Sequence, residues 1–195
     1  MDESVFLGIN QGWANPLLDA LFGWVSQRPA FAFPLLALIL VLLWRRMGAA
    51  GVRLWCLLLA VIVLGDLLGN LLKHLLLQPR PCSELAGQVR LVEAPFAVGC
   101  NPKPHGMPSN HALNFFVTAM FTAGMLRSWR WGLALGAVAV LVGLSRIYLG
   151  VHYPSQVLAG AMLGIGLGAL AVLVVRRVSP LARWLGLPCR RCGPA

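Results

Sequence analysis

Four apolar runs in this sequence are each long enough to cross the hydrocarbon core of a bilayer as a helix. A transmembrane helix needs about 20 predominantly apolar residues. A fifth run, about Phe31–Met47, is shorter and contains Pro34. With 58% hydrophobic and 11% charged residues, the chain is also far from the composition of soluble domains. We therefore predict an all-α integral membrane protein, a bundle of about five transmembrane helices. The four longer runs are about Val52–Leu77, Ser109–Leu126, Trp131–Gly150 and Ser155–Val175.

The first 28 residues alternate apolar and polar patches that are broken by Asn, Gly and Pro. This pattern predicts helices lying along the membrane interface, with a sixth span as the less favoured alternative. The acidic start lacks the basic region of a cleaved signal peptide. We divide the chain into N-terminal interfacial helices (1–30), a transmembrane core (31–178) and a basic cytoplasmic tail (179–195).

The formal net charge is +10, from 16 Lys and Arg against 6 Asp and Glu. On a soluble protein this would suggest nucleic acid, but the chain has no long basic run, so we expect no nucleic-acid partner. With five spans, the arginines that flank helices fall on one side, which the positive-inside rule assigns to the cytoplasm. The long loop at 78–108 and the turn at 150–154 then face the exterior. We expect a bacterial inner-membrane protein whose outer face is periplasmic.

Two further patterns concern packing. Cys82 and Cys100 share the long loop and can pair if that loop faces an oxidising compartment. Gly160, Gly164 and Gly168 recur every fourth residue, which lets helix backbones approach closely. The alternative is that glycine is simply common in membrane helices.

Five ionisable residues lie inside the expected spans or at their outer ends: Lys73, Arg80, His111, Arg146 and His152. Ionisable groups at such positions are costly and by default mark function. Snorkelling of a long side chain to the headgroups explains any one of them, and it is an even alternative for Lys73 or Arg80 alone. It does not explain why all five converge on the outer face, where no positive bias is expected.

The chemistry of this set suits a multiply charged anion. Arginine offers a planar fork that matches phosphate oxygens, and lysine adds a point charge. Ser109 opens the apolar run at about Ser109–Leu126, and the free backbone N–H groups and helix dipole at such a helix start favour an anion. The two histidines can supply a nucleophile and a general acid. Since no His, Cys or carboxylate cluster has metal-ligand spacing, we expect neither a metal nor another cofactor.

Three short motifs resemble those of the type 2 phosphatidic acid phosphatase (PAP2) superfamily of membrane lipid phosphatases. Residues 73–81 match Lys-x6-Arg-Pro, residues 108–111 are similar to Pro-Ser-Gly-His, and residues 145–152 match Ser-Arg-x5-His. Each motif alone is weak, but the three occur in the right order and at outer helix ends. The resemblance covers about Asp66 to Gly168.

The resemblance implies a role for each matching residue. His152 would attack the phosphorus atom and form a phosphohistidine that water then hydrolyses. His111 would protonate the leaving oxygen and afterwards activate the water. The family works without a metal. The phosphoryl oxygens would be held by Lys73, Arg80, Ser109, Asn110 and Arg146.

Two residues depart from the family pattern. Asn110 stands where glycine is usual, but asparagine tolerates unusual backbone conformations and can itself donate a hydrogen bond. Gln156 stands where the third motif normally has Asp, four residues after His152. Its carbonyl can still accept the imidazole N–H and orient the ring. Because it supplies no negative charge, we expect a lower pKa for His152 than an Asp would give.

The expected partners are the bilayer and a lipid phosphate substrate; the oligomeric state is not indicated. The strings at 106–109 and 155–157 are closer to the polyprenyl and dolichyl diphosphatases, which favours a polyprenyl diphosphate. Phosphatidylglycerophosphate, phosphatidate and a lipid A phosphate are the alternative substrates. Gln156 also keeps open a lipid phosphotransferase or a non-hydrolytic lipid binder.

Three other residues have less specific interpretations. Asp66 lies two turns before Lys73 and either pairs with it or shapes the pocket. Arg90, in the long loop, attracts anionic headgroups or, as the favoured alternative, is simply solvated. Tyr148 is interpreted as an interfacial anchor.

Overall fold

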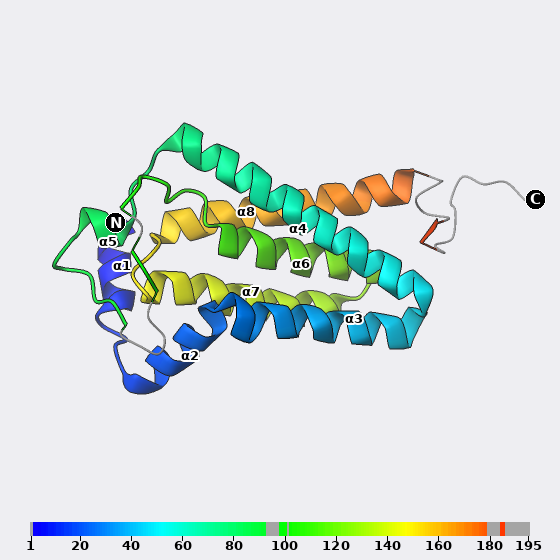
Figure 1. The fold of residues 1–195 in the computed structure, drawn as a ribbon, viewed down its shortest axis with the longest axis horizontal. Helices are drawn as coiled ribbons and strands as arrows, with labels where there is room; N and C mark the ends of the chain where they lie inside the picture. The colour runs from blue at the N-terminus through cyan, green and yellow to red at the C-terminus, as the bar shows by residue number, and fades with distance from the viewer. Residues whose placement is uncertain (1, 93–97, 101, 179–183, 186–195) are drawn as a thin grey trace, which may run out of the picture.

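The structure is a computed structural model that describes residues 2–92, 98–100, 102–178 and 184–185. Throughout this part of the chain, all regular secondary structure is helical (Figure 1). The chain begins with two short helices, α1 (Asp2–Asn10) and α2 (Pro16–Ser26), and a π-helical turn, η1 (Arg28–Ala32). The helices that follow are α3 (Phe33–Met47), α4 (Ala49–Leu76), α5 (Pro81–Glu84), α6 (Asn110–Leu126), α7 (Trp129–Tyr148) and α8 (Pro154–Arg177).

The five long helices α3, α4, α6, α7 and α8 run alongside one another (Figure 1). Four segments among the described residues are long and apolar enough to cross a membrane, which confirms an all-α integral membrane fold. They are Pro29–Met47, Ala49–Glu84, Trp129–Tyr148 and Pro154–Arg177.

The remaining expected span, about Ser109–Leu126, corresponds to α6, which has 17 residues. At 1.5 Å per residue it is about 25 Å long. It packs against α4, α7 and α8 and therefore lies at the centre of the bundle. A count of five crossings remains a prediction, because α6 is shorter than the four helical segments that meet the length of a span.

Pro34 lies in the first turn of α3, where its missing N–H has no helical partner to lose. For this reason the proline does not shorten the segment. The apolar helical stretch extends back through η1 to Pro29, two residues before the expected start.

The glycine stripe of α8 rests on α6. A Cβ atom at Gly160 would lie 2.4 Å from the Ser109 carbonyl oxygen, and one at Gly164 would lie 2.4 Å from that of Leu113. At Gly168 the Cβ of Met120 is 3.0 Å away. Only glycine permits contacts this close, so close backbone approach is confirmed as the meaning of the repeat.

The N-terminal helices α1 and α2 have 9 and 11 residues, too few to cross a bilayer alone. They lie at the end of the bundle where α6 and α8 begin, and they pack against α7 (Figure 1). Their place in the membrane interface and the division into three regions remain predictions. Most of the tail at 179–195 lies outside the described residues.

Candidate active site

The ends of four helices meet at one end of the bundle and bring the three motifs together (Figure 1). Lys73 lies in the last turn of α4 and Arg146 in the last turn of α7. Ser109 is the residue before α6, and His152 lies two residues before α8. The chain returns to this end each time because α4 and α7 run towards it and α6 and α8 run away from it.

His152 is buried, with 2% of its surface exposed. Its backbone N–H donates to the carbonyl oxygen of Arg146 over 3.2 Å, which ties the histidine to the end of α7. Its ring atom Nδ1 lies 3.0 Å from Oε1 of Gln156. The glutamine thus holds one ring nitrogen and leaves Nε2 as the nitrogen that can face a substrate.

Gln156 connects all three motifs. Its Nε2 donates to the carbonyl oxygen of Pro79 over 2.7 Å, and Pro79 directly precedes Arg80. Its backbone carbonyl accepts the N–H of Ser109 over 3.0 Å. An Asp at this position has no donor for Pro79, so the glutamine adds a contact that the usual residue cannot make.

The local electrostatics keep His152 neutral. Burial lowers the pKa of its imidazole well below the ordinary value, and the charges of Arg146, Arg80 and Lys73 lower it further. The hydrogen bond that the ring donates to Gln156 opposes this shift only in part. At neutral pH the ring is therefore unprotonated, and it lies among three cations.

Among the described residues, the site holds buried donor atoms that have no hydrogen-bond partner. Nε of Arg80 and Oγ of Ser109 are two such atoms. Buried polar atoms are rarely left unpaired, and an oxygen of a bound phosphoryl group would accept from both. The first backbone N–H groups of α6 point out of the start of that helix, next to Ser109, and add further donors for an anion.

Metal ligands are a separate matter. Across the residues that the structure describes, no three His, Cys, Asp or Glu side chains gather into a group that could hold a metal ion.

Asn110 makes its side-chain hydrogen bonds to α4. Its Nδ2 donates to Oδ1 of Asp66 over 3.1 Å and to Oδ1 of Asn70 over 2.9 Å, both on α4. Its side-chain amide therefore links α6 to α4. Its backbone N–H is one of the free N–H groups at the start of α6. Any role of Asn110 in binding phosphate remains a prediction and would fall to this N–H.

His111 follows in the first turn of α6. It lines a cavity that also contacts Asp66. Of the two roles considered for Asp66, the structure supports the pocket, because Asp66 lines this cavity, and its carboxylate accepts hydrogen bonds there from Asn110 and Asn114.

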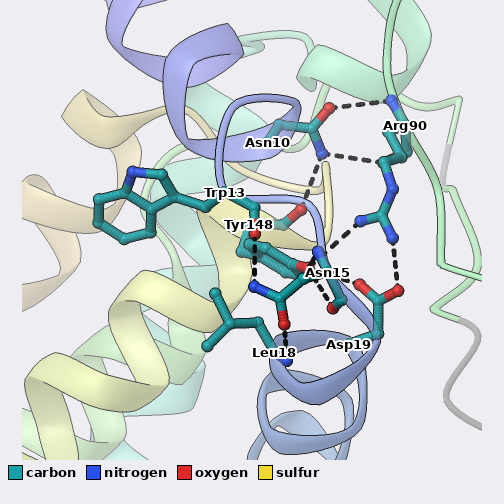
Figure 2. Close-up of polar contacts among 7 residues, drawn as sticks. All are labelled: Asn10, Trp13, Asn15, Leu18, Asp19, Arg90 and Tyr148. Atoms are coloured by element: carbon teal, nitrogen blue, oxygen red, sulfur yellow. Dashed lines mark hydrogen bonds and ion pairs between the residues drawn. The ribbon is translucent and has the colours of Figure 1, made fainter.

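Sequence reasoning missed the contribution of the N-terminal helices. Nη1 of the buried Arg146 donates to Oγ of Ser26, the last residue of α2. The interpretation of Tyr148 as an interfacial anchor is wrong, because the side chain is fully buried and its hydroxyl donates to Asp19 (Figure 2). Arg90 is not merely solvated but forms an ion pair with Asp19. The available signal was the place of Tyr148 inside the third motif, between Arg146 and His152.

The long loop is closed by a disulfide between Cys82 and Cys100. The sequence left this pairing open, and the structure shows it formed. The bridge joins α5, directly after Arg80, to the part of the loop that leads to Ser109.

The sequence profile described as the PAP2 superfamily matches residues 53–180. The lipid A 4'-phosphatase of Porphyromonas gingivalis is 26% identical over 97% of this chain and 78% of its own length. The undecaprenyl-diphosphatase of Sulfolobus acidocaldarius is 32% identical over 69% of this chain and 60% of its own length.

Two crystal structures are similar over most of this chain. LpxE of Aquifex aeolicus superposes with a TM-score of 0.67 at 27% identity and covers 88% of this chain and 94% of its own. A PAP2-type phosphatidylglycerolphosphate phosphatase of Bacillus subtilis gives 0.64 at 25% identity, covering 90% and 87%.

Proposed function

Because this chain belongs to the PAP2 superfamily, we propose that it hydrolyses the phosphate of a membrane lipid through a phosphohistidine formed at His152. The observation that carries this proposal is the convergence of Lys73, Arg80 and Arg146 on a buried, neutral imidazole. Phosphoryl transfer depends mostly on positioning and on stabilising the charge of the phosphoryl oxygens. The three cations supply that charge without a metal.

The reaction has two steps. In the first, Nε2 of His152 attacks phosphorus, the bond to the lipid oxygen breaks, and His111 gives its proton to that oxygen. In the second, His111 takes a proton from water, the water oxygen attacks phosphorus, and inorganic phosphate leaves His152. Arg80, Arg146 and Lys73 hold the phosphoryl oxygens in both steps, together with Ser109 and the first N–H groups of α6.

The substrate is reached from the side of the membrane where the helix ends meet. The disulfide at this end favours an oxidising compartment, and Arg45, Arg46 and Arg176 lie at the opposite ends of α3 and α8. Both features support an active site at the periplasmic face of a bacterial inner membrane. The sequence strings favour a polyprenyl diphosphate, whereas the similarity over nearly the whole chain to a lipid A 4'-phosphatase favours a lipid A phosphate.

The decisive experiment measures phosphate release by the purified protein in detergent with EDTA, on a panel of these lipids. His152→Ala should lower turnover at least about 1,000-fold, since it removes the nucleophile. His74→Ala, which removes an exposed histidine at the end of α4, is the matched control and should keep most of the activity. Acid-labile loss of ³²P label from a trapped enzyme would identify the phosphohistidine.

Two results would contradict the proposal. An unchanged rate in the His152→Ala variant would exclude a nucleophilic role, and loss of activity with EDTA would exclude the metal-independent mechanism. Product analysis separates the alternatives, since a phosphotransferase yields a new lipid phosphate instead of free phosphate.

A further inference from the structure

A cavity of about 180 Å³ lies between α3, α4 and α6, near the end of the bundle that carries the site. Phe33 and Leu36 from the start of α3 line it, with Ile62 from α4 and Phe115 from α6. At the start of α6, His111 also lines it. The cavity is therefore an apolar space next to the residue proposed to protonate the leaving oxygen, where the lipid part of a substrate would lie.

One carboxylate lines this apolar cavity. Asp66 is the sole Asp or Glu in the sequences of α3, α4, α6, α7 and α8. An ionisable group at such a depth is costly and by default marks function. The proposed phosphohistidine chemistry gives Asp66 no task, because the acid and the nucleophile are both histidines.

The carboxylate is held in a fixed orientation. Nδ2 of Asn114 donates to its Oδ1 over 2.9 Å, and Nδ2 of Asn110 donates to the same oxygen over 3.1 Å. Both recorded donors among the described residues thus reach Oδ1, and Oδ2 remains as an acceptor for another molecule. Asn110 and Asn114 are one turn apart on α6 and lie on either side of His111 in sequence.

This arrangement places Asp66 close to His111, the residue proposed to protonate the leaving group. One helical turn rises about 5.4 Å, so a carboxylate bonded to residues 110 and 114 lies within about one turn of His111 along α6. A lipid oxygen protonated by His111 would therefore have the next few bonds of its alcohol next to Oδ2.

We infer that Asp66 is a specificity-determining residue that selects lipid phosphomonoesters whose alcohol carries an O–H or N–H group a few bonds from the ester oxygen. The inference rests on the proposed function. A hydroxyl or amide N–H can donate to the carboxylate, and such charge-assisted bonds are strong. A hydrocarbon in the apolar cavity leaves this acceptor unpaired, which is costly.

The same carboxylate disfavours diphosphates. In a diphosphate the leaving group is itself a phosphate, whose anionic oxygens would lie against Asp66. Like charges repel strongly where little water is present. Asp66 therefore favours a sugar or glycerol phosphate over the polyprenyl diphosphate expected from the sequence strings.

The test compares two lipids that differ by one hydroxyl: 1-oleoyl-lysophosphatidate and its 2-deoxy analogue. The wild-type protein should hydrolyse the hydroxylated lipid with kcat/KM about tenfold higher or more, as expected for a hydrogen bond to a charged group. It should hydrolyse geranylgeranyl diphosphate more slowly than the hydroxylated lipid. Equal rates on the matched pair would overturn the inference and leave the proposed function standing, because both lipids would be hydrolysed.

Variants assign the preference to the carboxylate. Asp66→Asn should reduce the preference for the hydroxyl and raise activity on the diphosphate, since it removes the charge but keeps the size. Ile62→Val changes the volume of the same cavity and should keep the preference. Asp66→Ser serves as the second variant if Asp66→Asn does not fold. A preference unchanged in an Asp66 variant would overturn the inference, and no hydrolysis of any of the three lipids would instead count against the proposed function.

Discussion

Two helix interfaces position the residues of the candidate active site, and they differ in the kind of contact that forms them. The interface between α6 and α8 is backbone against backbone: Gly160 of α8 lies directly on the carbonyl of Ser109. The interface between the N-terminal helices and α7 is side chain against side chain: Phe22 packs on the ring of Tyr148, and beside this apolar contact Asp19, Tyr148 and Arg90 of the long loop are bonded to one another (Figure 2). The first positions Ser109 against Gln156, and the second positions Arg146.

The two interfaces should differ in how well they tolerate substitutions. The glycine contact leaves no space for a side chain, because an added Cβ would collide with backbone atoms, which cannot move aside as a side chain can by changing rotamer. A hydrogen-bonded contact loses one bond when one partner is changed, and the surrounding bonds remain. Asn10, for example, also holds α7, through a 2.7 Å bond from its Nδ2 to the carbonyl oxygen of Tyr148 (Figure 2). We therefore expect the glycine interface to fail abruptly and the polar interface to weaken in steps.

The largest effect is expected from Gly160→Ala. The new Cβ would lie 2.4 Å from the Ser109 carbonyl oxygen and push the start of α6 away from Gln156. Overpacking of this kind costs about 3 kcal/mol. Gly166 lies on the same helix with no atom within 4 Å of its Cβ position, so Gly166→Ala is the matched control and should be neutral or slightly stabilising.

Thermal unfolding in detergent and phosphate release would measure both variants. Equal unfolding temperatures for Gly160→Ala and Gly166→Ala would show that α6 and α8 can separate without cost. The α6–α8 interface would then tolerate substitution as well as the interface of the N-terminal helices with α7, and the proposed difference would not hold.

A smaller effect is expected from Ser26→Ala, which acts on the polar interface. It removes the hydroxyl that accepts from Arg146, while the buried guanidinium and its remaining contacts stay. Hydrogen bonds to charged groups contribute about 1.5 kcal/mol or more, so kcat/KM should fall about tenfold. Inhibition by inorganic phosphate should weaken in parallel, because Arg146 binds the phosphoryl oxygens in the proposed mechanism.

Ser26→Thr keeps the hydroxyl and should restore most of the activity, whereas Ser4→Ala, at an exposed serine of α1, should change nothing. A purely structural role for Ser26 would lower the unfolding temperature without weakening inhibition by phosphate. That outcome would remove the N-terminal helices from the description of the site.

The two interfaces also differ in how far the sequence predicts them. The glycine repeat is local, since its spacing of four residues alone indicates one face of a helix, and its meaning could be predicted. The polar interface joins residues far apart in the chain: Ser26 and Arg146 are 120 positions apart, and Asp19 and Tyr148 are 129 apart. No periodicity links such residues, so only the fold reveals that they meet.

The contacts among the three sequence motifs could be predicted in part: more than the polar interface, but less than the glycine repeat. His152 and Gln156 are one helical turn apart, and their contact followed from that spacing. The bond from Gln156 to Pro79 did not, because it depends on where the loop after α4 returns. The exchange of Asp for Gln was therefore predicted as a loss of charge, whereas the structure shows that it also gains a hydrogen bond.

The smallest effect is expected from Asp19→Asn, and its pH dependence distinguishes the two interfaces. Burial opposes ionisation of Asp19, but hydrogen bonds from Arg90 and Tyr148 outweigh it and hold the pKa of the carboxyl below its usual value. A lowered pKa in the folded state stabilises the protein above the unfolded pKa of about 3.9, and this contribution is lost as the pH falls through the folded value. Because the side chain is 23% exposed, the effect should stay below about 1 kcal/mol.

The difference in unfolding temperature between the wild type and Asp19→Asn should thus be constant above about pH 5 and shrink below about pH 4. The deficit of Gly160→Ala should be the same at every pH in that range, because the contact between α8 and the Ser109 carbonyl contains no titrating group. A Gly160→Ala deficit that also shrank in acid would mean that the two interfaces unfold as one unit. Arg146 and Ser109 would then be positioned by a single cooperative structure, and the contrast between rigid and tolerant contacts would have no consequence for the active site.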